Sequence, residues 1–137
     1  MSRLEARVLV PGEGAGEVLK LDEPLSLWGG LDPRSGEVID RRHPQCGANV
    51  RGTILVLPVG RGSSSASSVL LEAVRLGTAP AAIVTEEADS ILALGATVAR
   101  ELYQRGPAVV VLSPAAYERL ETGSHWRVEA DGALVGD

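Results

Sequence analysis

A glycine- and serine-rich run at residues 58–68 contains the residues of this sequence best suited to chemistry. Its centre reads Gly-Arg-Gly-Ser-Ser-Ser at residues 60–65. A short segment rich in β-branched residues, 53–57, precedes the run, and a segment of helical composition, 69–76, follows it. The run is therefore expected to turn from a strand into a helix. The unpaired amides and positive dipole of a helix N-terminus favour an anion, and Arg61 adds a guanidinium. These features predict an anion-binding turn for a carboxylate or a phosphate.

The serine hydroxyls of this turn could also take part in proton transfer. A free serine is too weak a base, but amide donors and the guanidinium could stabilise its alkoxide. No neighbouring histidine or aspartate suggests a protease-like triad, and the Gly-Lys-Ser/Thr ending of an ATP P-loop is missing. Two plainer interpretations are a flexible linker and serines that only cap the helix. The position between two core segments argues against a linker, and one cap accounts for one serine but not for three.

The elements around the turn predict a single α/β domain over residues 1–137, with a layered β/β/α arrangement. Three short helices are expected at residues 69–76, 90–104 and 114–121, the first ended by Gly77, and Gly95 could break the second. The expected strands cover residues 4–10, 16–21, 37–40, 53–57, 79–85 and 107–112, followed by a hairpin over residues 124–135 that turns on Asp131 and Gly132.

Composition excludes several classes of function. The net charge of −5 argues against a nucleic-acid binder, which needs clustered Lys and Arg. No run approaches the length of a membrane span and no charged-then-apolar leader opens the chain, so no membrane partner and a cytoplasmic location are expected. One cysteine, Cys46, excludes an internal disulfide and any zinc site or cluster built from this chain's thiolates alone. If the chemistry needs a metal, another chain is expected to hold it.

Several spaced motifs extend this interpretation over nearly the whole chain. In order they are Trp28-Gly29-Gly30-Leu31-Asp32-Pro33, Gly36, His43-Pro44, Gly47, Gly52-Thr53-Ile54-Leu55-Val56, Gly60-Arg61-Gly62-Ser63-Ser64-Ser65 and Ala79-Pro80-Ala81-Ala82-Ile83-Val84. Together they resemble the small subunit of aconitase X enzymes, which are hydro-lyases with a separate or fused swivelling domain. The resemblance implies a swivelling β/β/α domain and a dehydration reaction.

The resemblance also implies roles for individual residues. The Gly-Ser-Ser at residues 62–64 is similar to that of the aconitase swivelling domain, whose first serine is the base that moves the substrate proton. It implies that Ser63 is the catalytic base and Ser64 the next candidate. The arginine that follows in aconitase is replaced by Ser65, which implies a different substrate grip that Arg61 partly restores. The implied substrate-binding residues are Arg61, Gly62, Ser64, Ser65, Asp32 and His43.

Cofactor, partner and substrate follow from the same resemblance. It implies an iron or iron–sulfur centre on a large partner subunit, with none bound by this chain, and an active site at the interface of a heterodimer. A bacterial member would be expected to dehydrate the small hydroxy acid cis-3-hydroxy-L-proline, and an archaeal member mevalonate 5-phosphate. A sequence rich in Ala, Leu and Arg favours a bacterial source and the first substrate.

Two function classes compete with the dehydratase. Residues 95–102 are similar to the swivelling phosphohistidine domain of phosphoenolpyruvate-using enzymes, but Leu94 stands where that family has its histidine, which counts against phosphotransfer. The other class is a non-catalytic regulatory or assembly module.

Several residues also admit plain structural interpretations. Asp32 could serve only its turn, and His43 could be a solvated loop histidine. Trp28 is expected to be a core or interface anchor, and Cys46 a small buried residue. The acidic residues 86, 87 and 89 are expected to form a solvated loop.

Overall fold

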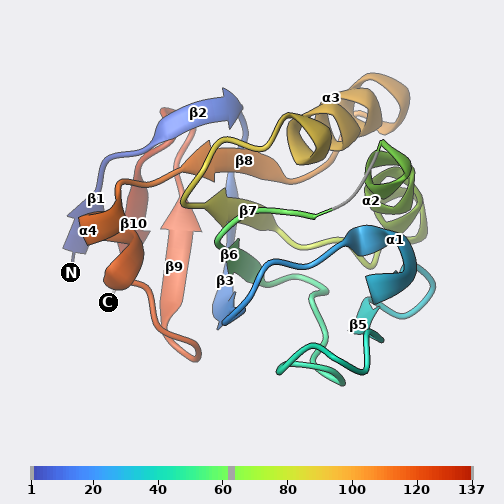
Figure 1. The fold of residues 1–137 in the computed structure, drawn as a ribbon. Coiled ribbons are helices and arrows are strands. Elements are labelled where there is room, and N and C mark those ends of the chain that lie inside the picture. Colours follow the sequence, from blue (N-terminus) through green and yellow to red (C-terminus); the bar gives the residue numbers. More distant parts are fainter. Residues whose placement is uncertain (1, 62–63, 137) are drawn as a thin grey trace.

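The computed structural model describes residues 2–61 and 64–136. An eight-stranded mixed sheet forms its centre (Figure 1). Four neighbouring strands run parallel: β3 (Gly14–Lys20), β6 (Ile54–Leu57), β7 (Ala82–Thr85) and β8 (Ala108–Val111). Antiparallel strands extend the sheet beyond β3, in the order β9 (His125–Val128), β10 (Leu134–Gly136) and β1 (Ser2–Leu4), and β2 (Arg7–Val10) pairs with β8. Strands β6 and β7 are buried on both faces, as their continuous apolar sequences predict.

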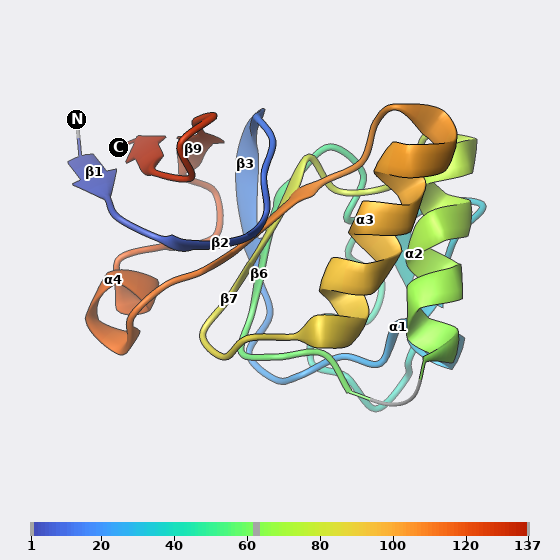
Figure 2. The same cartoon turned by 90° about the horizontal axis from the view of Figure 1, so that it is seen from above.

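The two edge strands, β1 and β2, are joined by only two residues, Glu5 and Ala6. The sheet therefore curls so that one short segment of chain reaches both edges (Figure 2). The turn between β9 and β10 lies against β2, where a Cβ at Gly132 would overlap Cγ2 of Val8. The predicted single strand over residues 4–10 is wrong, because its first part pairs with β10 and its second part with β8.

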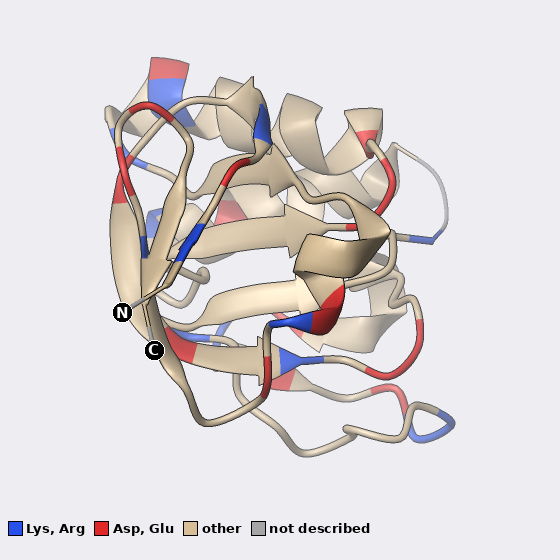
Figure 3. Ribbon diagram, turned by 90° about the vertical axis from the view of Figure 1, so that its left-hand side faces the viewer, with Lys and Arg blue, Asp and Glu red and all other residues tan. Residues whose placement is uncertain are grey.

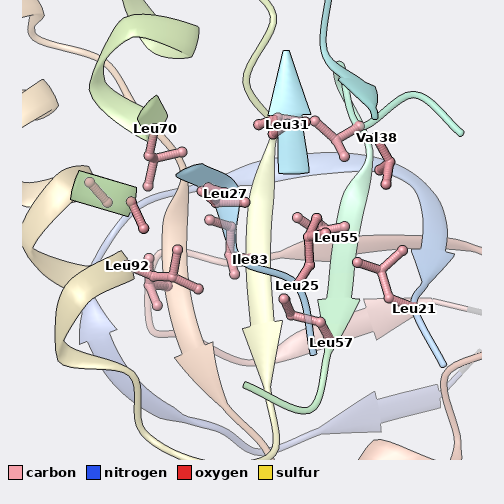
Figure 4. Close-up of a cluster of buried hydrophobic side chains, with 14 of the residues drawn as sticks. Leu21, Leu25, Leu27, Leu31, Val38, Leu55, Leu57, Leu70, Ile83 and Leu92 are labelled. Carbon is pink, nitrogen blue, oxygen red and sulfur yellow. The ribbon is translucent and has the colours of Figure 1, made fainter. Parts of the chain in front are cut away.

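Helices α2 (Ser65–Leu76) and α3 (Ser90–Tyr103) pack side by side on one face of the sheet (Figure 1, Figure 2). A core cluster fills the space beneath them, where Leu70 of α2 and Leu92 of α3 point toward Ile83 of β7 (Figure 4). A second cluster lies between the strands and α4 (Pro114–Glu118), with Tyr117 and Trp126 among its members. The predicted layered α/β class is confirmed.

The helix after the turn begins earlier than predicted, at Ser65. Ser67 and Ser68 therefore belong to the helix and not to the turn. Their polar side chains had suggested a turn. The helix ends where predicted, at Gly77, whose φ of 79° is left-handed. Helix α3 continues through Gly95, so the break considered there is absent. Gly95 instead permits close packing, because a Cβ at this position would lie 2.9 Å from the carbonyl oxygen of Ser67 in α2.

Residues 22–52 are ordered by apolar side chains that point into the first core cluster. The segment contains α1 (Leu27–Gly30), β4 (Leu31–Asp32) and β5 (Glu37–Val38), so the strand predicted at 37–40 is only two residues long. Although α1 is a fourth helical segment beside the three predicted, its Trp28 and Gly29 have non-helical dihedral angles and it amounts to a turn. Leu25, Leu27, Leu31 and Val38 are all buried beneath this segment (Figure 4).

Acidic and basic residues are interspersed over the strands and loops of the side that carries both chain ends (Figure 3). Within residues 2–61 and 64–136, no helix has the length and apolar character needed to cross a membrane.

Candidate functional site

The candidate site lies where three loops follow the parallel strands β3, β6 and β7. Carboxyl ends of parallel strands meet at one edge of a sheet, which is the usual place for a ligand in such folds. The predicted catalytic Ser63, together with Gly62, lies outside the described residues. Arg61, on one side of them in sequence, and Ser64 and Ser65, on the other, are described and exposed.

Hydrogen bonds from two neighbouring loops fix the backbone that leads to Arg61. The Gly60 amide donates to Oδ2 of Asp89 over 2.7 Å. The Arg61 amide donates to the carbonyl of Leu25 over 3.2 Å, and Leu25 and Gly60 form a parallel bridge. The loop after β7 therefore holds the backbone of the turn at Gly60, and the loop after β3 holds it at Arg61.

Arg61 lines two hollows. The first, which we call the loop hollow, has a volume of about 220 Å³ and is lined by the apolar Leu25, Leu27 and Val59 together with Asp89. The second, the arginine hollow, has a volume of about 500 Å³. Its lining includes Arg41, Arg42, His43 and Arg61 together with the acidic Glu23 and Asp40. The Arg61 side chain forms no ion pair or hydrogen bond with any other residue of the described ranges. Its charge is thus available to an anion.

Asp89 is a functional candidate that sequence reasoning missed. It is only 7% exposed, so the prediction of a solvated acidic loop is wrong at this residue. Its Oδ1 accepts from the amides of Ile91 and Leu92, each over 3.0 Å, and caps α3. Its Oδ2 accepts from Gly60, so the carboxylate is bound by amides on two elements. The available signal was an aspartate directly before the expected helix start at Ser90.

His43 is buried beside the arginine hollow, so the interpretation as a solvated loop histidine is wrong. Its Nδ1 accepts from the amide of Gln45 over 3.0 Å. The proton therefore lies on Nε2, which donates to the carbonyl of Glu23 over 3.0 Å. Both ring nitrogens thus hold the surrounding loop together, and a substrate contact by His43 stays a prediction.

Asp32 is not brought to Arg61. Its Oδ1 accepts from the amide of Arg34 over 2.9 Å inside its own turn, and it lines neither hollow. Its predicted role in substrate binding stays a prediction.

The hydroxyl of Ser64, the described serine at the start of the helix, does not act as the cap that the plainer interpretation required. Ser64 occupies the N-cap position of α2, and among the described residues its side chain makes no capping hydrogen bond. Its carbonyl accepts from the amide and hydroxyl of Ser67 over 3.1 and 2.5 Å. Ser65 lies in the first turn of the helix.

Of the plain structural interpretations, that of Trp28 is wrong in part and that of Cys46 is wrong. Trp28 is 65% exposed at the arginine hollow, which excludes a core role and leaves a role at an interface. Cys46 is exposed rather than buried. Within the described ranges, no group of three or more His, Cys, Asp or Glu side chains could hold a metal ion.

Comparison with known proteins identifies relatives across nearly the whole chain. The family model described as the aconitase X swivel domain matches residues 3–136. The cis-3-hydroxy-L-proline dehydratase of Pseudomonas aeruginosa is 49% identical over 130 residues, which cover 93% of this chain and 22% of that protein. The phosphomevalonate dehydratase small subunit of Methanothermobacter thermautotrophicus is 45% identical over 96 residues, covering 70% of this chain and 73% of that protein.

A solved structure agrees with the sequence matches. The crystal structure of Thermococcus kodakaraensis aconitase X in its holo-form superposes with a TM-score of 0.88 and 34% identity, and covers 100% of this chain and 99% of that one. The chain spans only about a fifth of the length of the curated cis-3-hydroxy-L-proline dehydratases that it matches.

Proposed function

This chain belongs to the aconitase X swivel-domain family, and we propose that it supplies the anion-binding turn and the base of a dehydratase acting on a small hydroxy acid. The proposal rests on the arrangement of Arg61. The amides of Gly60 and Arg61 are bound by the loops after β7 and β3, and the Arg61 guanidinium, which lines two hollows, is unpaired within the described part of the chain.

Each residue of the turn has a distinct task in the proposed dehydration. Arg61 binds the substrate carboxylate and stabilises the negative charge that grows there as the neighbouring carbon loses its proton. Ser63, as its alkoxide, takes that proton, the electron pair of the broken C–H bond forms the new double bond, and the hydroxyl on the next carbon leaves as water. A serine can do so only where its charged form is stabilised, and the positive end of α2 and the Arg61 guanidinium are the sources of that stabilisation.

The chain's own residues do not fit an iron or iron–sulfur centre. The sequence contains a single cysteine, and the described residues offer no cluster of metal ligands. We therefore assign the iron centre that the family implies to a large partner subunit, with which this chain would form a heterodimer. The exposed Trp28 and the arginine hollow are suited to the surface where that partner closes the site.

The proposed substrate is cis-3-hydroxy-L-proline, because the relative at 49% identity carries that name. Mevalonate 5-phosphate is the second candidate. Relatives named as phosphomevalonate dehydratase small subunits match over 58% to 97% of this chain, and arginines around the hollow would bind a phosphate as well as a carboxylate.

The test is a reconstituted complex with its large partner, assayed with both substrates. We expect Ser63→Ala to lower kcat by about 10²- to 10⁴-fold, the usual contribution of a general base, while the complex still assembles. The matched control is Ser68→Ala, another exposed serine of the same segment, which should retain full activity. Unchanged activity in Ser63→Ala would instead support a non-catalytic assembly module. Stable labelling of a histidine by phosphoenolpyruvate would support the phosphotransfer alternative.

A further inference from the structure

We propose that Asp89 is a positioning residue that sets the direction of Arg61 by fixing the Gly60 amide. The inference rests on the proposed function, in which Arg61 grips the substrate anion. Asp89 itself need not contact substrate, because it acts through the backbone of the turn.

The geometry divides the Asp89 carboxylate into two separate tasks. Oδ1 accepts from the amides of Ile91 and Leu92 and caps α3. Oδ2 accepts from Gly60, which is 29 residues earlier and belongs to the loop after β6. A helix cap needs only the first oxygen. The second is therefore surplus to folding of α3 and serves the turn.

The hydrogen bond from the Gly60 amide to Asp89 requires a residue without a side chain at position 60. A Cβ at residue 60 would lie 2.5 Å from Oδ2 of Asp89, so only glycine lets the backbone come within reach of the carboxylate. The contact is also shielded, since Asp89 is buried. A charge-assisted hydrogen bond in such a place is stronger than a neutral one in water.

The consequence falls on Arg61, the next residue. Its guanidinium has no partner in the described ranges that would aim it, and it borders both the loop hollow and the arginine hollow. The backbone therefore sets the point and the initial direction from which this long side chain reaches toward the hollows. Releasing Gly60 lets the turn shift, and a misplacement of about 1 Å in a substrate-positioning group can cost about 100-fold in rate.

Two substitutions separate the two tasks of the carboxylate. In Asp89→Asn, the side-chain carbonyl can still cap α3, but the amide group presented to Gly60 is a donor and cannot accept its hydrogen. Asp89→Ser also keeps a good capping residue and lacks the second oxygen. It provides the same test should the asparagine variant fold poorly. Ser113→Ala is the matched control, because it removes the cap of α4 without touching the turn.

The first readout is amide hydrogen exchange by NMR on the full chain, which does not depend on activity. We expect exchange at Gly60 to accelerate at least about tenfold in Asp89→Asn, while the Leu92 amide keeps its protection because the cap persists. Unchanged protection of Gly60 would overturn the proposal.

The second readout is a double-mutant cycle in the reconstituted complex. Asp89→Asn should lower kcat/KM by about 100-fold in the wild-type background and by less than about twofold on top of Arg61→Ala, because both act through one group. Equal losses in the two backgrounds would mean that Asp89 is merely structural and would overturn the proposal. If Gly60 loses protection but neither Arg61→Ala nor Ser63→Ala changes the rate, the proposed function fails instead.

Discussion

His43 shows how a site-like residue can serve the fold. Its buried ring joins the loop at Glu23 to the loop at Gln45 through both nitrogens. We expect His43→Ala to lower the free energy of unfolding by about 2 kcal/mol, since two hydrogen bonds and buried packing are lost. Urea denaturation gives the measurement.

The control for this substitution is His125→Ala, an exposed histidine of β9, which should stay within about 0.5 kcal/mol of the wild type. Equal stability in the two variants would contradict the structural role. A loss of kcat/KM in folded His43→Ala, well below its unfolding transition, would support the predicted substrate contact.

At the level of residues, the sequence singled out Arg61 but not the residues that hold its backbone; the anion site itself stays a prediction. Gly-Arg-Gly before a helix predicted an anion site, and Arg61 is exposed at two hollows. Asp89 was missed because several acidic residues close together in sequence suggest a solvated loop. Its hydrogen bond to the turn involves Gly60, 29 residues earlier, which the local sequence does not reveal. Serine suits turns and helix caps equally well. The sequence therefore did not show at which of the several serines α2 begins.

The contact between α2 and α3 gives a prediction at the level of elements. In Gly95→Ala the new Cβ would lie 2.9 Å from the Ser67 carbonyl oxygen and 3.1 Å from its Cα. Alanine favours a helix over glycine by about 1 kcal/mol, but overpacking against backbone costs about 1–3 kcal/mol. We therefore expect a net loss of stability, measured as a lower urea midpoint.

Thr97→Ala, at an exposed position of the same helix, is the control and should not be destabilising. A gain in stability for Gly95→Ala would show that the two helices separate easily. The α2 segment next to the predicted base would then be less firmly held than the packing indicates.

Helices and strands with a strong local sequence pattern could be predicted, whereas the pairing of strands could not. Continuous apolar runs predicted β6, β7 and β8, and Ser113 with Pro114 predicted the start of α4. The division of residues 2–10 into β1 and β2 depends on pairing with distant strands, which local alternation does not encode. The irregular residues 22–52 are ordered by burial against the rest of the fold, which no local periodicity reveals.

At the scale of the whole molecule, Tyr117 couples stability to alkaline pH. Burial raises the pKa of Tyr117 to about 12, and the charges of Glu86, Glu118 and Asp22 add to the effect. Its hydroxyl has no hydrogen-bond partner among the described residues. An unfolded tyrosine loses its proton near pH 10. The folded protein keeps the proton longer, so stability is full below about pH 10 and falls as the pH rises toward 12.

Tyr117→Phe should remove this alkaline fall and leave stability at neutral pH equal or higher, because an unpaired buried hydroxyl is deleted. The measurement is the free energy of unfolding in urea at several values from pH 8 to pH 11. A wild-type curve that stays level over this range, or a variant with the same slope, would contradict the prediction.

Ser2 pairs with Gly136, so the first and last described strands are hydrogen-bonded neighbours. Both views place the two termini on the side away from α1 and the start of α2 (Figure 1, Figure 2). A further polypeptide joined to either terminus would begin on this same side of the molecule, away from Arg61. This geometry is compatible with the domain as a free-standing chain or as one segment of a longer one, without any change around Arg61.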